Sequence, residues 1–342
     1  MGSEEPKVTS VGGDDEALSQ LIWGFTASQT VYVAAKLGIA DVLRDQSKTP
    51  REIAGAVGAD EAALHRLLRA LTTVDVLVED EHGRFAATPT GELLRSDHPQ
   101  SLRAFAMCFG SPLFWQPWGN LDQAIVTGQP AFDRVYGQSF FDYLGRSPAD
   151  AAAFNAAMTS RNRGELAAIL AAYDFSRFTR IVDVGGGQGT FLRGILERYP
   201  EATGVLFDLP SVVAEACELT EAPVAARCDI VSGDMFNEVP QGGDVYILKG
   251  IVHDWSDTEA LRILRNCRRA IVDEGRILVA DLIIAPSNQP DAAKWLDLNM
   301  LVMLTGRERT ETEFRDLYTA AGFRLARIIP TPGPSLIEGV PV

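Results

Sequence analysis

The chain has 342 residues, of which 46% are hydrophobic and 23% charged, a composition typical of a globular protein long enough for two domains. Its 31 basic and 46 acidic residues give a net charge of -15, which argues against nucleic acid as a partner because phosphate groups would be repelled. No apolar stretch is long enough to cross a membrane, and the N-terminus lacks the pattern of a secretory signal. We therefore expect a cytoplasmic protein that begins with a flexible, unprocessed tail.

The four cysteines, Cys108, Cys217, Cys228 and Cys267, lie far apart, without a CxxC spacing and without histidines close by in the sequence. Reduced thiols explain this pattern better than a metal site does. Of the four histidines, only His253 lies in the last two thirds of the chain. We therefore expect no bound metal.

Residues 14–98 carry the pattern of a winged-helix-like domain. Apolar residues at helical spacing over residues 15–44 indicate one long or two short helices. The sequence TPRE at residues 49–52 predicts a helix that starts with a capping box, and Asp60 can cap the helix that follows. Residues 76–88 then predict two short strands joined by a turn at a His-Gly pair.

A winged helix is best known as a DNA reader, so its charge decides between two interpretations. The segment from Lys48 to Arg95 contains eight acidic and six basic residues, and the expected wing is acidic. A DNA reader needs the opposite balance. The pattern therefore favours a packing module over a DNA-binding domain.

We expect residues 99–172 to form a helical linker. The stretch from residue 101 to residue 147 is rich in aromatic side chains, which can form core, the wall of an aromatic pocket, or both. A helix over residues 150–172 ends this region. From residue 179 to the C-terminus, short apolar runs alternate with helical patterns. Residues 173–342 are therefore predicted to form an α/β domain with a Rossmann-like, doubly wound and mostly parallel sheet that ends in an antiparallel hairpin.

The glycine-rich loop after the first strand of this sheet is the strongest chemical signal. Glycines let a ligand approach the backbone at the carboxyl edge of the sheet. A dinucleotide site needs GxGxxG, whereas this loop is GxGxG, with Thr190 at the position of the last glycine, which favours S-adenosylmethionine (SAM) over NAD. The second strand ends in Asp208, 23 residues after Gly185, where a carboxylate can accept hydrogen bonds from ribose hydroxyls. After the third strand, the sequence SGDMF offers a polar group and apolar faces to an adenine ring.

His253 follows the fourth strand, on the sheet edge that carries the glycine loop. A hydroxyl is a poor nucleophile until its proton leaves, and histidine is suited to removing that proton near neutral pH. Asp281, at the end of the fifth strand, or Glu308, in the segment GRERTE, could orient the imidazole. The position favours a catalytic histidine over a structural one.

The segments VDVGGGQG, FDLP, GDMF, ILKGIVHDWSD and GRERTETEF, in this order and spacing, resemble those of the SAM-dependent small-molecule O-methyltransferases that act on caffeate, flavonoids and polyketides. The resemblance covers nearly the whole chain. It implies a class I methyltransferase fold and an N-terminal winged-helix-like domain that forms a homodimer, so dimerisation would replace DNA binding.

The resemblance also implies roles for individual residues. It places His253 as the general base, Asp281 and Glu308 as the carboxylates that brace it, and Lys249 at the polar end of SAM. The remaining cofactor positions are Gly185, Gly187, Asp208, Leu209, Asp234, Met235 and Phe236. The acceptor pocket is expected to be lined by Phe154, Met158, Asn162, Asp254, Asn299, Met300 and Met303. Asn299 is more polar than the usual plant residue, which favours an acceptor other than a lignin precursor.

The expected reaction is an in-line displacement that leaves S-adenosylhomocysteine (SAH), with positioning as the main source of acceleration. Three alternatives stay open: a SAM-binding relative that performs hydroxylation, decarboxylation or cyclisation, a SAM-sensing winged-helix regulator, and an NAD dehydrogenase. The sequence names neither the acceptor nor the position methylated. A nitrogen or sulfur nucleophile would suit the same geometry.

Overall fold

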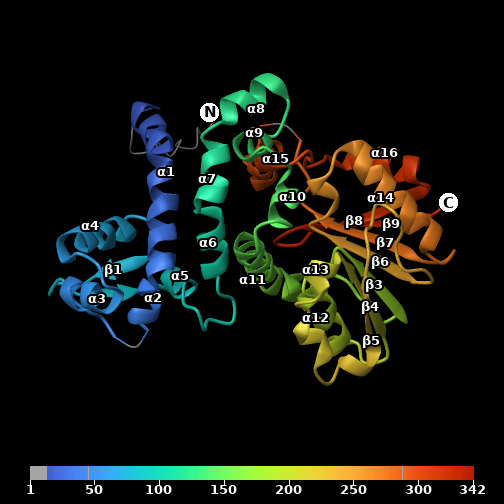
Figure 1. Ribbon diagram of the computed structural model, residues 1–342, viewed down its shortest axis with the longest axis horizontal. Coiled ribbons are helices and arrows are strands. Elements are labelled where there is room, and N and C mark those ends of the chain that lie inside the picture. Colours follow the sequence, from blue (N-terminus) through green and yellow to red (C-terminus); the bar gives the residue numbers. More distant parts are fainter. Residues whose placement is uncertain (1–13, 45, 287) are drawn as a thin grey trace, which may run out of the picture. The chain divides into compact units, whose positions relative to one another are not determined.

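The computed structural model describes residues 14–44, 46–286 and 288–342. The predicted N-terminal tail lies largely outside these residues, and so does the side chain of Cys217. Within the described part, the chain divides into two compact units, one ending at Ser111 and the other beginning at Pro112 (Figure 1). The expected linker 99–172 is thus divided between the units, and the three-part division stays a prediction.

The first unit contains six helices and a two-stranded sheet in its described residues. They are α1 (Asp14–Leu37), α2 (Ile39–Val42), α3 (Pro50–Val57), α4 (Glu61–Thr72), β1 (Leu77–Glu79), β2 (Phe85–Ala87), α5 (Pro89–Glu92) and α6 (Arg103–Phe109). Gly38, whose φ of 69° suits glycine, separates α1 from α2. The region 15–44, predicted as one long or two short helices, thus forms one long and one short helix.

The local signals of this unit are confirmed. The Thr49 hydroxyl accepts a hydrogen bond from the backbone of Glu52, whose carboxylate accepts from the backbone of Thr49 at 2.7 Å, so the capping box is complete. Asp60 caps α4 by accepting from the Ala63 amide at 2.8 Å. β1 and β2 pair antiparallel, with Leu77 opposite Ala87. Helix, turn, helix and hairpin are thus all in place.

The second unit begins with a helical segment and continues as an α/β sheet. The helical segment consists of α7 (Pro112–Trp118), α8 (Leu121–Thr127), α9 (Ala131–Tyr136), α10 (Phe140–Leu144) and α11 (Pro148–Ala172). Aromatic residues form its core: buried Phe132 contacts Phe140 edge to face at 5.2 Å between ring centroids, and Phe140 contacts Phe154 of α11 at 5.1 Å. The aromatic stretch is therefore core in part, as the sequence suggested.

Seven strands form the sheet, in the order β5-β4-β3-β6-β7-β9-β8. The strands are β3 (Arg180–Val184), β4 (Thr203–Asp208), β5 (Cys228–Ser232), β6 (Val245–Lys249), β7 (Arg276–Asp281), β8 (Phe323–Ile329) and β9 (Ser335–Pro341). The intervening helices are α12 (Thr190–Arg198), α13 (Pro210–Val213), α14 (Asp257–Ala270), α15 (Ala292–Met303) and α16 (Glu311–Ala321), with short 3-10 turns at Cys217–Thr220, Ala225–Arg227 and Val252–Asp254. The first five strands of the order are parallel, and β9 pairs antiparallel with both β7 and β8. The predicted doubly wound sheet with a terminal hairpin is confirmed.

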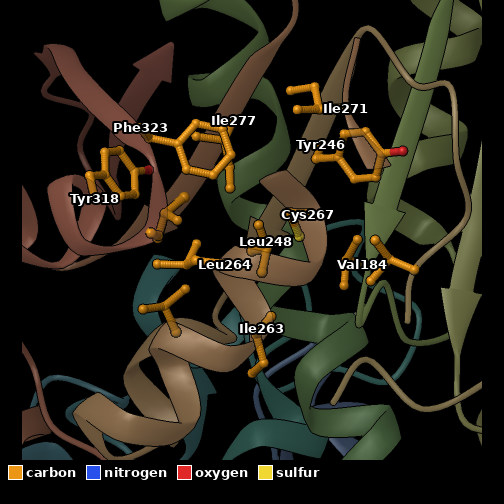
Figure 2. Close-up of a cluster of buried hydrophobic side chains, with 14 of the residues drawn as sticks. Val184, Tyr246, Leu248, Ile263, Leu264, Cys267, Ile271, Ile277, Tyr318 and Phe323 are labelled. Atoms are coloured by element: carbon orange, nitrogen blue, oxygen red, sulfur yellow. The ribbon is translucent and has the colours of Figure 1, made fainter. Parts of the chain in front are cut away.

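Alternate residues of the central strands face opposite layers. On one face, Val184, Tyr246 and Leu248 pack with residues of α14 and α16 (Figure 2). On the other face, Ile181 and Ile247 pack with residues of α11 and α12. A strand buried on both faces reads as a continuous apolar run, which is the pattern the sequence shows. The strand order reverses between β3 and β6, and open α/β sheets bind their ligands outside the carboxyl ends of the strands at such a point.

Candidate active site

The glycine loop connects β3 to α12. Gly185 and Gly187 have φ values of 69° and 62°, which L side chains rarely adopt. A Cβ atom at Gly185 would lie 2.4 Å from the Ile251 side chain, whereas nothing lies within 4 Å of one built at Gly187. The loop therefore packs tightly on the β6 side and leaves open space beside its central glycine.

Asp208 ends β4 and tethers this loop. Its carboxylate accepts hydrogen bonds from the backbone amides of Gly187 at 2.8 Å and Leu209 at 2.7 Å. Burial raises the pKa of Asp208, and these two amides oppose the rise by stabilising its charge. A carboxylate has about four lone-pair positions, so two acceptor positions are left for a ligand.

Asp234 organises the turn after β5. One carboxylate oxygen accepts from the Phe236 amide at 2.9 Å, and the other accepts from the side chain of Asn237 at 2.9 Å. The Met235 carbonyl accepts from Asn266 of α14 at 2.7 Å. Phe236 meets Trp255 edge to face at 4.7 Å. The turn is thus fixed by its own side chain and by the segment that carries His253.

Lys249, the last residue of β6, is buried against α11. Its ammonium donates to Asn162 at 2.6 Å and to Glu165 at 2.5 Å. Burial lowers the pKa of Lys249, and the Glu165 charge opposes this. The structure thus joins Asn162, expected in the acceptor pocket, to Lys249, expected at the polar end of the cofactor. Glu165 was missed by sequence reasoning, because nothing in a long helix marks the residue that will face a strand.

His253 is buried at the carboxyl end of the sheet and is 7% exposed. Two carboxylates contact it, one at the ring and one at the backbone amide. Its Nδ1 lies 2.6 Å from Glu308 Oε1, so Glu308 holds the ring. Asp281 Oδ2 instead accepts from the backbone amide of His253 at 3.1 Å. The sequence left open which carboxylate orients the imidazole, and the structure assigns the ring contact to Glu308. The other ring nitrogen, Nε2, lies 3.5 Å from Asp254.

The charges around His253 determine its protonation. Burial lowers its pKa, but the carboxylates of Asp281, Asp254 and Glu308 outweigh burial and raise it to about 10. Burial raises the pKa of Asp254 to about 7, and the charge of His253 opposes the rise. The pKa of Asp281 is also raised, chiefly by burial. At neutral pH the imidazole of the free chain is therefore protonated on both ring nitrogens, and this cation lies between carboxylates.

The segment that carries Glu308 packs directly on the segment that carries His253. A Cβ atom at Gly306 would lie 2.0 Å from the His253 carbonyl oxygen. Arg309 is fully buried and donates to the carbonyls of Val252 and Trp255. Sequence reasoning stopped at Glu308 and missed both neighbours.

The predicted acceptor positions lie on α11 and α15. Asn299, Met300 and Met303 are buried on α15, and Asn299 accepts a hydrogen bond from the Trp118 indole at 3.0 Å. On α11, Phe154 packs against Phe140, and Met158 is half-buried. Trp118 belongs to the aromatic stretch that the sequence offered as core or pocket wall, and its contact with Asn299 was not predicted. Over the described residues, no group of three or more His, Cys, Asp or Glu side chains is arranged to hold a metal ion, and no helix is long and apolar enough to span a membrane.

Two family matches cover most of the chain. Residues 118–324 match the O-methyltransferase domain, and residues 19–97 match the O-methyltransferase dimerisation domain. The chain belongs to this O-methyltransferase family. It is a SAM-dependent methyltransferase of class I fold, with the N-terminal dimerisation domain that the resemblance implied.

Individual relatives match this chain over nearly its full length. The phenazine O-methyltransferase PhzM of Lysobacter antibioticus is 43% identical over 95% of this chain and 96% of its own length. The crystal structure of LaPhzM superposes with a TM-score of 0.91, at 42% identity over 97% of this chain and 100% of that one. The methyltransferase NcsB1 of neocarzinostatin biosynthesis, solved with SAM and 2-hydroxy-5-methyl naphthoic acid, has a TM-score of 0.80 at 31% identity, over 97% of this chain and 100% of that one.

Proposed function

We propose that this O-methyltransferase methylates a hydroxyl group of a small aromatic, phenolic or polyketide-like acceptor, with His253 as the general base. The contact between His253 Nδ1 and Glu308 carries the proposal. It fixes which ring nitrogen is bonded to the protein and leaves Nε2 to exchange a proton with the acceptor. Asp281 holds the backbone of the same residue, so both the ring and its attachment are fixed.

In the proposed reaction, the protonated His253 releases its Nε2 proton when SAM binds, and the neutral Nε2 then takes the hydroxyl proton of the acceptor. When bound, SAM supplies the methyl group, which passes to the acceptor oxygen as the carbon–sulfur bond breaks and SAH is left. The chain's own contribution is to hold the acceptor oxygen in line and to accept its proton. The imidazolium that forms lies among the carboxylates of Glu308, Asp254 and Asp281, which stabilise its charge.

The cofactor would lie along the glycine loop. Gly185 and Gly187 allow its close approach, and the two remaining acceptor positions of Asp208 suit the ribose hydroxyls. Leu209, Asp234, Met235 and Phe236 would surround the adenine, and Lys249 would face the carboxylate of the methionine part. These residues fit the group because they combine an open glycine cradle with a tethered acid. No metal enters this proposal.

The acceptor would lie between α11 and α15, against Phe154, Met158, Asn162, Asn299, Met300 and Met303, with Asp254 beside the base. An apolar wall with a few polar groups suits a planar aromatic molecule. The naphthoic acid in the NcsB1 structure supports this acceptor class. Some curated relatives are N-methyltransferases, so aromatic amines belong in the test as well.

The homodimer is proposed on the first unit alone. Leu18, Leu21, Ile22, Trp23 and Phe25 of α1 are each more than half exposed, an apolar surface of the kind that partners cover. Residues 19–97 match a dimerisation domain, which supports a second copy as the partner. Sedimentation of the purified chain as a dimer would agree, and a stable monomer would contradict it.

The reaction is tested by SAH release and product mass, from SAM and a panel of phenols, naphthols, aromatic polyketides and aromatic amines. We expect a product heavier by one methyl group. In His253→Gln, turnover should fall by a factor of about 10² to 10⁴, the usual contribution of a general base. SAM should still bind this variant, since His253 makes none of the proposed cofactor contacts. Wild-type turnover in this variant would contradict the base, and SAM binding without methylation across the panel would favour a non-methylating reaction.

A further inference from the structure

Two segments of the second unit, far apart in sequence, pack against each other beside His253. We call residues 252–257 the base segment and residues 306–309 the clamp segment. Glu308 of the clamp segment reaches the His253 ring at 2.6 Å. Gly306 and Arg309, on either side of Glu308 in the clamp segment, both contact the backbone of the base segment.

Arg309 uses all three of its guanidinium nitrogens. Nη1 donates to the Val252 carbonyl at 2.9 Å, and Nη2 donates to the Trp255 carbonyl at 3.0 Å. Nε and Nη2 both donate to Asp257, at 3.0 and 2.9 Å. The two carbonyls bracket His253 and Asp254, so one rigid planar group spans the turn that presents the base.

The contact at Gly306 brings the two backbones together. A Cβ atom there would fall 2.3 Å from the Asp254 carbonyl carbon and 2.5 Å from the Trp255 nitrogen. No side chain fits between the segments at this point. The distance from the Arg309 backbone to the base segment is therefore fixed, and the guanidinium reaches the two carbonyls from a defined origin.

A buried arginine is a costly way to stabilise a loop. Removing a guanidinium from water costs several kcal/mol, and an apolar side chain of similar volume often stabilises a fold as well or better. Arg309 is 1% exposed, and the carboxylate that it bonds is that of Asp257, whose side chain is 58% exposed. Its other partners are main-chain carbonyls and include both that bracket the base. Such a group fixes a geometry, which suits a residue that orients a base.

We propose that Arg309 is a positioning residue for the methyl transfer: it holds the turn at residues 252–255 so that the His253 ring meets Glu308 and presents Nε2 to the acceptor. The proposal rests on the role of His253 as the base. A displacement of about 1 Å in a reacting group can lower a rate by about a hundredfold, so small movements of this turn matter.

The test compares Arg309→Lys with Arg307→Lys. Arg307 is a matched control because it also pairs with Asp257, at 3.1 Å, while its side chain is 42% exposed and it bonds neither bracketing carbonyl. We expect Arg309→Lys to lower kcat by about tenfold to a hundredfold, with little change in the KM for SAM. Arg307→Lys should keep kcat within about twofold of the parent, as expected for an exposed ion pair.

A second measurement reports geometry without catalysis. In NMR spectra we expect a resonance from the proton between His253 Nδ1 and Glu308. Its loss in His253→Gln would assign it. In Arg309→Lys this resonance should shift or broaden, and in Arg307→Lys it should stay unchanged. A fall in kcat with an unchanged resonance would overturn the proposal, because a purely structural loss would not move the ring. Equal kcat values in the two lysine variants would overturn it too.

One further variant, Asp257→Asn, and the earlier His253→Gln distinguish a failure of this proposal from a failure to fold and from a failure of the base assignment. If Arg309→Lys does not fold, Asp257→Asn loosens the guanidinium from its exposed end and should lower kcat and shift the same resonance; parent values would overturn the proposal. If His253→Gln retains full turnover, the base assignment fails, and the resonance in Arg309→Lys still decides whether Arg309 holds the ring.

Discussion

On the glycine-loop side of the site, built from the ends of β3, β4 and β5, the acidic side chains bond chiefly the turns at this edge of the sheet. Asp234 bonds the backbone and side chain of residues two and three positions away, and Asp208 bonds its neighbour and the glycine loop. The base side, at the ends of β6 and β7, relies on distant partners: Asp281 and Glu308 stand 28 and 55 positions from His253.

The two sides differ in charge as well as in connectivity. On the glycine-loop side, main-chain amides donate most of the hydrogen bonds to Asp208 and Asp234. These two acids are therefore held in place for a ligand without a buried ion pair of their own. On the base side, His253 and three carboxylates are buried together, and their charges shift the pKa values of His253, Asp254 and Asp281. A substitution on the glycine-loop side should therefore act on cofactor affinity, and one on the base side should act on turnover.

The largest effect is expected from Glu308→Gln, which keeps the shape of the side chain and removes its charge. The imidazolium formed during the reaction loses its closest carboxylate, so kcat should fall by a factor of about 10² to 10⁴. Asp281→Asn should cost only about tenfold, because an amide oxygen can still accept from the backbone of His253. Steady-state kinetics at saturating SAM measures both. Equal losses, or a larger loss for Asp281→Asn, would contradict the assignment of the ring contact to Glu308.

A smaller effect, of a different kind, is expected from Asp208→Asn. The amide keeps one acceptor oxygen but turns a donor toward the backbone amides that the carboxylate now accepts. We expect SAM to bind about tenfold to a hundredfold more weakly, which corresponds to about 1.4–2.8 kcal/mol, with kcat at saturation nearly unchanged. Calorimetric titration with SAM, and kcat at high SAM, separate the two quantities. A fall in kcat with unchanged affinity would erase the proposed difference between the two sides.

The glycine-loop side was largely predictable because its signals are local. The GxGxG loop, the acid at the end of the next strand and the GDMF turn each lie within one stretch of chain, and the structure places them at one edge of the sheet. The capping box at Thr49 and the terminal hairpin were predictable for the same reason. Their roles toward SAM stay proposals.

The base side could be predicted only in part. The position of His253 after β6 follows from the strand pattern, but which carboxylate meets the ring depends on how the clamp segment packs on the base segment. That packing rests on Gly306 and Arg309, which carry no catalytic signature in sequence. Glu165 and the contact of Trp118 with Asn299 were missed for the same reason, since the partners lie 84 and 181 positions away.

A dependence of SAM affinity on pH is also expected, and it connects the two sides. In the free chain the pKa of His253 is raised to about 10, so below that pH the ring is a cation. A sulfonium bound nearby disfavours this second positive charge, so the pKa of His253 falls and a proton is released on binding. Affinity for SAM should therefore rise with pH from about 7 to about 10, by at most about tenfold per pH unit, and level off above that range.

Ionisation of Asp254, whose pKa is raised to about 7, adds a change of the same sign at the lower end of this range, because a carboxylate favours the bound cation. Titration of SAM in two buffers with different heats of ionisation counts the protons released. His253→Gln separates the two groups, since it should remove the dependence above about pH 8 and leave that of Asp254 below it. If the wild-type chain releases no proton when SAM binds, the sulfonium does not lie near the imidazole. That result would contradict the proposed arrangement of cofactor, acceptor and base.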